Sequence, residues 1–242
     1  MPPSPSIDES RGSNGQSGPL AVETVAHFAL SPQMTDIFRA LGYPREVTPP
    51  SAQVGMIERL VADALPHLHP RGTYALYAVA GQDPHSVTIG GSVIKGSIGE
   101  FLQGANRIAV FMVTVGSEIS RMAEASCQAG DPFSGWALDA IGSWGAEAAA
   151  DALMKSLQRH LVDHESLTMR YSPGYCGMDL RQQQNLFRLV PAESIGITLL
   201  PSQLMQPMKS VSGIVGLGPK ELVGGNLSPC DRCPQVGCHM RR

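Results

Sequence analysis

The chain has 242 residues, a length that suits one large domain or two small ones. It has 18 Lys and Arg residues against 21 Asp and Glu residues. The net charge of −3 therefore argues against binding nucleic acid by broad phosphate neutralisation. The longest nearly unbroken apolar run, Ile108–Val115, is far shorter than the ~20 residues that span a bilayer, and no signal-peptide pattern is visible. We expect a cytoplasmic protein with neither a membrane nor a nucleic acid as partner.

The composition divides the chain into three parts. Residues 1–21 are rich in Ser, Gly and Pro and cannot bury enough apolar surface to offset the entropy of ordering, so we expect a disordered tail. Residues 22–218 are expected to form the globular domain. Residues 219–242 form a Cys-rich C-terminal tail without hydrophobic periodicity.

Helices and strands alternate in the first half of the domain. Helical spacing predicts a helix that has Ser51 as its N-cap and is closed by Pro66. Three strands are predicted at Thr73–Ala80, Ser86–Ile89 and Arg107–Val115, the last of which is apolar on both faces, as central strands are.

The second half is predicted to hold the longest helix and two further strands. A helix capped by Ser117 should end before Gly130, and the longest helix should run from Pro132 to about Val162. A short helix near Gln182–Leu189 precedes strands near Ile195–Leu200 and at Val211–Leu217.

Small residues surround Glu147 on the longest predicted helix. Gly142 and Gly145 each cost helix stability on the order of 1 kcal/mol relative to Ala. Their size would let another backbone, or a ligand, approach. Glu147 is either a solvated surface residue or part of that close approach.

A loop between the long helix and the last strands combines a turn with polar and aromatic side chains. It reads Arg170-Tyr171-Ser172-Pro173-Gly174-Tyr175-Cys176-Gly177. Pro173 fixes φ and Gly174 permits a positive φ, so the chain can turn sharply. Arg170 offers donors matched to a carboxylate, and Tyr175 an aromatic face. The loop suits a small zwitterion with an aromatic ring, although Pro-Gly-Tyr is also a common surface turn.

In combination, these motifs resemble the activation domain of cobalamin-dependent methionine synthase. That family carries an Arg-x-x-x-Gly-Tyr motif, present here as Arg170, Gly174 and Tyr175, and a later Ser-Val-Ser-Gly segment, present as Ser210–Gly213. Further similar positions are Val113–Gly116, Gly130, Asp131, Leu138–Ser143, Ile195–Leu200, Ser202, Met205 and Pro207. The similarity covers roughly residues 50–217.

The resemblance implies binding of S-adenosylmethionine and reactivation of an oxidised corrinoid. In the family, one-electron reduction of cob(II)alamin is coupled to methyl transfer from S-adenosylmethionine, giving methylcobalamin, while the protein positions the donor. By position, Arg170 would hold the methionine carboxylate, and Pro173, Gly174 and Tyr175 would shape the ligand wall. Glu147 would face the ligand's amino group or ribose.

The chain also departs from the family pattern. The 23 positions from Glu147 to Arg170 are fewer than in the full-length enzyme, and an N-terminal acidic contact has no clear counterpart. We expect a standalone reactivation subunit, because 242 residues leave no room for homocysteine, folate and cobalamin modules. Its partner would be a separate corrinoid methyltransferase such as methionine synthase. A further electron-donor protein could supply the electron for the reduction.

Three of the five cysteines lie close together near the end of the chain. Cys230, Cys233, Cys238 and His239 could form a closed zinc site, or the three cysteines could hold an iron–sulfur cluster. Free thiols on a flexible end are the plainer alternative, and a disulfide framework is disfavoured by the odd count. Cys127 is expected to be buried packing, and Cys176 a small filler in the Arg170 loop.

Two functional hypotheses follow. The first is the S-adenosylmethionine-binding reactivation subunit. The second is a metal- or Fe–S-binding electron-transfer or scaffold protein for a corrinoid system, with a vestigial ligand pocket. The resemblance predicts an α+β fold with a twisted, mainly antiparallel sheet and packed helices, whereas the residue pattern alone also allows an α/β sheet.

Overall fold

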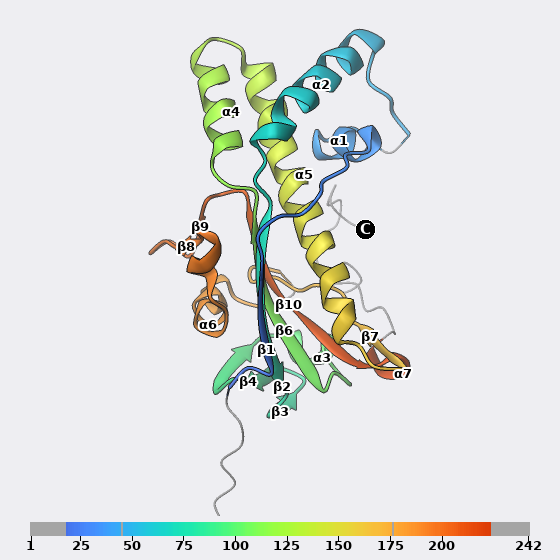
Figure 1. The fold of residues 1–242 in the computed structure, drawn as a ribbon, viewed down its shortest axis with the longest axis vertical. Coiled ribbons are helices and arrows are strands. Elements are labelled where there is room, and N and C mark those ends of the chain that lie inside the picture. The colour runs from blue at the N-terminus through green and yellow to red at the C-terminus, as the bar shows by residue number, and fades with distance from the viewer. Residues whose placement is uncertain (1–17, 45, 176, 224–242) are drawn as a thin grey trace, which may run out of the picture.

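The computed structural model describes residues 18–44, 46–175 and 177–223 (Figure 1). Its centre is a five-stranded sheet in the order β1-β2-β6-β10-β7, in which every neighbouring pair is antiparallel. These strands are Ala21–Val25, Arg71–Ala78, Arg107–Thr114, Ser210–Pro219 and Glu165–Leu167 respectively. The predicted α+β class with a mainly antiparallel sheet is confirmed.

A helical layer packs on one face of this sheet. Helix α5 (Pro132–Leu157) lies along the strands, and α1 (Met34–Ala40), α2 (Ser51–Ala64) and α4 (Glu118–Gln128) pack against α5, with α2 and α4 extending beyond the end of the sheet (Figure 1). Successive strand residues face opposite sides, so Tyr74, Phe111 and Val215 pack into the core beneath these helices.

The other face holds a second core. It receives Ala75, Val110 and Ile214 from the sheet. Shorter elements close it: α3 (Ile98–Phe101), α6 (Gln183–Leu189), a small sheet of β3 (Gly81–Asp83), β4 (Ser86–Ile89) and β5 (Ser92–Lys95), and the pair β8 (Thr198–Leu199) and β9 (Met205–Gln206). Among the described helices, none combines the length and hydropathy needed to cross a membrane.

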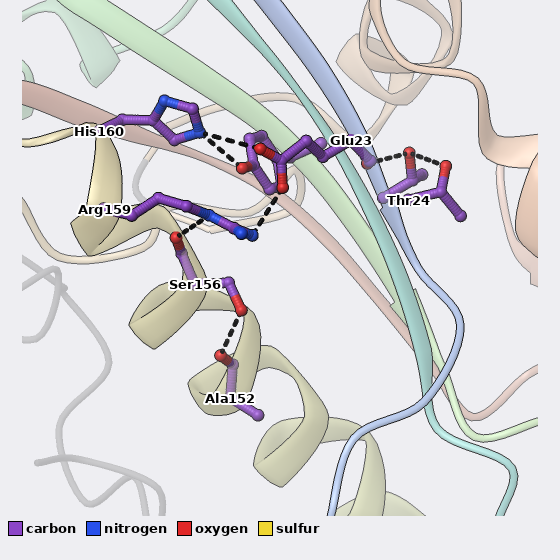
Figure 2. Close-up of polar contacts among 8 residues, drawn as sticks. Glu23, Thr24, Ala152, Ser156, Arg159 and His160 are labelled. Carbon is purple, nitrogen blue, oxygen red and sulfur yellow. Dashed lines mark hydrogen bonds and ion pairs between the residues drawn. The ribbon is translucent and has the colours of Figure 1, made fainter.

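The 3-10 turn Gln158–His160, which directly follows α5, is bonded to the first strands by a polar network (Figure 2). Arg159 and His160 both reach Glu23 of β1, at 2.6 and 3.4 Å, and Nε2 of His160 is 2.7 Å from the hydroxyl of buried Tyr74. Burial, reinforced by the nearby Glu23 carboxylate, raises the pKa of Tyr74 to about 12. The network holds the edge strand β1 against the helical layer.

Several local predictions need correction. The N-cap of α2 is Pro50, so Ser51 is already helical, and Ser117 stands at the N-cap of α4 without a side-chain capping bond. The predicted strand Ile195–Leu200 is mostly not extended, because Ile195 ends a 3-10 turn closed by left-handed Gly196. Strands β1, β3 and β5 and helix α1 were not predicted from the sequence.

The predicted domain boundaries cut into the fold at both ends. Ala21, assigned to the tail, begins β1 and pairs with Leu76. At the other end, β10 continues to Pro219, and α7 (Lys220–Val223) follows with Val223 buried. The rest of the two predicted tails, residues 1–17 and 224–242, lies outside the described residues.

Cys127 is not the buried residue that was predicted. It is exposed on α4, on the part of the helix that meets α5. A Cβ added to Gly135 of α5 would lie only 2.2 Å from the Cys127 sulfur. The same Cβ would lie 2.9 Å from the backbone oxygen of Ala123. Gly135 therefore allows α4 and α5 to cross closely.

Candidate functional site

Arg170 joins the loop after β7 to helix α5. Its Nη2 lies 3.2 Å from Oε2 of Glu147 and 2.8 Å from Oδ1 of Asp151, two carboxylates one helical turn apart. Its Nη1 is buried and has no hydrogen-bond partner among the described residues. The next residue, Tyr171, exchanges backbone hydrogen bonds with Ile214 of β10, which fixes the position of Arg170 beside the sheet.

The predicted turn after Arg170 is present. Gly174 has a φ of 91°, and its N–H donates to the carbonyl of Met178 at 2.8 Å. This left-handed conformation explains why glycine stands there. Tyr175 projects from the turn with 69% of its surface exposed. Cys176 lies outside the described residues.

A cleft of about 670 Å³ brings together residues that are far apart in sequence. Glu147, Pro173 and Tyr175 line it, as do Met205, Pro207 and Ser210–Ser212 of the later motif. Its remaining lining is Ser117, Ser120, Arg121, Glu124, Ser172, Leu180, Gln183, Leu200, Gln203, Leu204, Gln206 and Met208. Arg170 and Gly174, also predicted as site residues, do not line this cleft: Gly174 shapes its turn, and Arg170 contacts Glu147.

Two polar groups in the cleft lining were not found from the sequence. Oγ of Ser120 on α4 and Oε1 of Gln203 are buried without a hydrogen-bond partner among the described residues. Unsatisfied buried polar atoms are uncommon in native proteins, and a functional site is one of the places where they occur. Gln203 also has a φ of 69°, rare for a residue with a side chain. Neither residue has a local sequence signal, since only the fold brings it to the cleft.

A second hollow, of about 640 Å³, lies between α1 and α5. Its lining is charged and includes Asp36, Arg39, Glu147, Asp151 and Lys155. Glu147 borders both hollows, and 51% of its side chain is exposed. The carboxylate that the sequence singled out therefore stands between two candidate sites.

The first turn of α4, at the edge of the cleft, is anchored by histidines. Nδ1 of His67 lies 2.8 Å from Oε1 of Glu118, and Nε2 of His69 lies 2.9 Å from Oε2. Hydrogen bonds from His69 and His67 lower the pKa of Glu118. These contacts hold the loop before β2 against α4.

The predicted metal ligands Cys230, Cys233, Cys238 and His239 lie outside the described residues, so that site stays a prediction. Within residues 18–44, 46–175 and 177–223, no group of three or more His, Cys, Asp or Glu side chains forms a candidate metal site.

Comparison with known proteins gives a family and a fold. Residues 100–221 match the family model described as "Vitamin B12 dependent methionine synthase, activation domain". No curated protein matches the chain. Among solved structures, the chain is similar to the MetH reactivation domain bound to AdoHcy, with a TM-score of 0.59 and 20% identity over 83% of this chain and 79% of that one. At this identity the likeness supports the fold.

The family match covers about half of the chain and includes every residue that lines the cleft. The chain therefore belongs to the family of vitamin B12-dependent methionine synthase activation domains.

Proposed function

We propose that the chain binds S-adenosylmethionine in the cleft and presents its methyl group to a corrinoid held by a separate methyltransferase. The observation behind this proposal is the convergence of Glu147, the Pro173–Tyr175 turn and residues 205–212 on one cleft within the family-matched segment. A related solved domain is described as bound to AdoHcy, the product that S-adenosylmethionine leaves after methyl transfer.

The cleft suits such a ligand in size and lining. Its volume of about 670 Å³ lies within the range of small-molecule sites, roughly 300–1,000 Å³. Tyr175, Leu204 and Met208 provide apolar surface, while Ser120 and Gln203 provide polar groups without partners. A nucleoside joined to an amino acid needs both kinds of surface.

The corrinoid on the partner, reduced by an external one-electron donor, would supply the nucleophile that takes the methyl group from the sulfonium, leaving AdoHcy as the product. The chain's own residues would bind and orient the donor. The Glu147 carboxylate would attract the ligand's ammonium or sulfonium charge. Arg170 does not line the cleft but contacts Glu147, which does, and it would reach the ligand carboxylate from there by releasing Asp151, whose side chain is 68% exposed.

Calorimetric titration with S-adenosylmethionine tests this proposal. We expect micromolar affinity, and a loss of about tenfold or more in Arg170→Ala, because a charge-assisted hydrogen bond contributes roughly 1.5–3 kcal/mol. Arg181→Ala is the matched control, since Arg181 pairs with Asp179, whereas Arg170 pairs with the cleft residue Glu147. No binding heat at millimolar ligand would refute the proposal.

A further inference from the structure

Lys209, immediately before β10, is a buried cation whose partners lie on α5. Only 7% of the residue is exposed. Its Nζ lies 2.7 Å from Oδ1 of Asp139 and donates to Oγ of Ser143 at 2.9 Å. Lysine is seldom buried unless its charge is paired, so these two contacts account for its position.

Gly142 provides the space through which the lysine reaches these partners. A Cβ at Gly142 would lie 3.2 Å from Cγ of Lys209 and 3.0 Å from a methyl carbon of Ile119. Positions 139, 142 and 143 share one face of α5, because they are three and four residues apart. Asp139, Gly142 and Ser143 thus form the site on α5 that accommodates the Lys209 side chain.

The backbone around Lys209 is part of the cleft wall. The N–H of Val115 and the hydroxyl of Thr114 both donate to the carbonyl of Lys209, at 3.1 and 3.3 Å. Its neighbours Met208 and Ser210 line the cleft. Lys209 therefore links this part of the cleft wall to α5 through Asp139 and Ser143.

The same helix carries Glu147, which also lines the cleft. Eight residues separate Asp139 from Glu147, which corresponds to about 12 Å along a helix. A contact at Asp139 consequently sets the distance between the Met208–Ser210 wall and the Glu147 carboxylate.

We propose that Lys209 is a positioning residue that fixes this wall relative to Glu147 for ligand binding. The proposal rests on the proposed function, because it assumes that the cleft holds S-adenosylmethionine. Lys209 would not touch the ligand. Without it the ligand would have to order the wall on binding, at a cost of about tenfold in affinity.

Three variants test the contact between Lys209 and α5 at different residues. Lys209→Met keeps the stem without the charge, Asp139→Ala removes the carboxylate partner of the lysine, and Gly142→Ala obstructs the passage while leaving both charges. Lys95→Met is the control, because Lys95 is exposed on β5 and does not line the cleft. Lys209→Arg, which can still reach Asp139, should restore binding.

Two measurements separate positioning from general stability. Titration with S-adenosylmethionine should show about tenfold weaker binding in the three variants, and hydrogen exchange should be faster in residues 203–212. Folded Lys209→Met with unchanged affinity would overturn the proposal, even if exchange were faster. If the unaltered protein bound no S-adenosylmethionine, the proposed function would fail. Unchanged hydrogen exchange in Lys209→Met would separately refute the positioning role of Lys209, whether or not the ligand binds.

Discussion

At the scale of residues, Glu147 and Asp151 share Arg170, but only one of them lines both hollows. Both line the charged hollow, whereas only Glu147 lines the cleft. We expect Glu147→Gln to weaken S-adenosylmethionine binding about tenfold, because it removes the charge facing a cationic ligand. Asp151→Asn should stay within about threefold of the unaltered protein. Calorimetry on both variants compares the two hollows directly: a larger loss in Asp151→Asn would place the ligand between α1 and α5.

Tyr74 gives a prediction about alkaline pH. Its pKa in the folded protein is raised to about 12 by burial and by Glu23, against an ordinary value near 10. The neutral phenol is thus favoured by folding, so its contribution to stability is complete below about pH 10 and is lost as pH rises towards 12. Denaturant unfolding across this interval should show a steeper decline for the unaltered protein than for Tyr74→Phe. Parallel declines in the two proteins would contradict the assignment.

At the scale of elements, the crossing of α4 and α5 depends on Gly135. Gly135→Ala should destabilise the protein by about 1–3 kcal/mol, because its Cβ would meet the sulfur of Cys127 and the backbone of Ala123. Gly55→Ala on α2 is the matched control, since the nearest atom to its Cβ is 3.9 Å away, on Arg59. Alanine should there raise the free energy of unfolding by about 0.5–1 kcal/mol. Urea unfolding of both variants measures the difference, and equal effects would show that the crossing tolerates a methyl group.

The elements with strong periodicity were predictable, and those that depend on distant partners were not. The apolar run of β6 and the long repeat of α5 indicate their own conformation. By contrast, β1 has only five residues, with polar Glu23 and Thr24 on opposite faces, and becomes a strand through pairing with β2 some fifty residues later. The apolar run after Ile195 suggested a strand, but Gly196 turns the backbone there.

The candidate site divides in the same way. Arg170, Gly174 and Tyr175 could be found because they occur together in one loop, and the fold places their turn beside Glu147. Ser120 and Gln203 carry no such pattern, because each reaches the cleft from a different element. The engagement of Arg170 by Asp151 was equally hidden, since it depends on how the loop meets α5.

At the scale of the whole molecule, the cleft should couple ligand binding to global unfolding. Its lining comes from α4, α5, the Ser172–Tyr175 turn, Leu180, the start of α6 and residues 200–212, so unfolding any of these parts would open the cleft. The segment before residue 100 adds β1, β2, α1 and α2 to the same sheet and core, which favours a single transition. S-adenosylmethionine at a hundred times its Kd should stabilise the native state by about 2.7 kcal/mol.

For a chain of this length, that stabilisation corresponds to a rise in Tm of about 5–10 °C. Thermal unfolding followed by calorimetry and by circular dichroism should give coincident transitions that move together with ligand. Arg170→Ala at the same ligand concentration should shift much less, because its affinity is lower. A ligand-induced shift confined to one of two separate transitions would show that the cleft belongs to a subdomain that unfolds independently of β1 and β2.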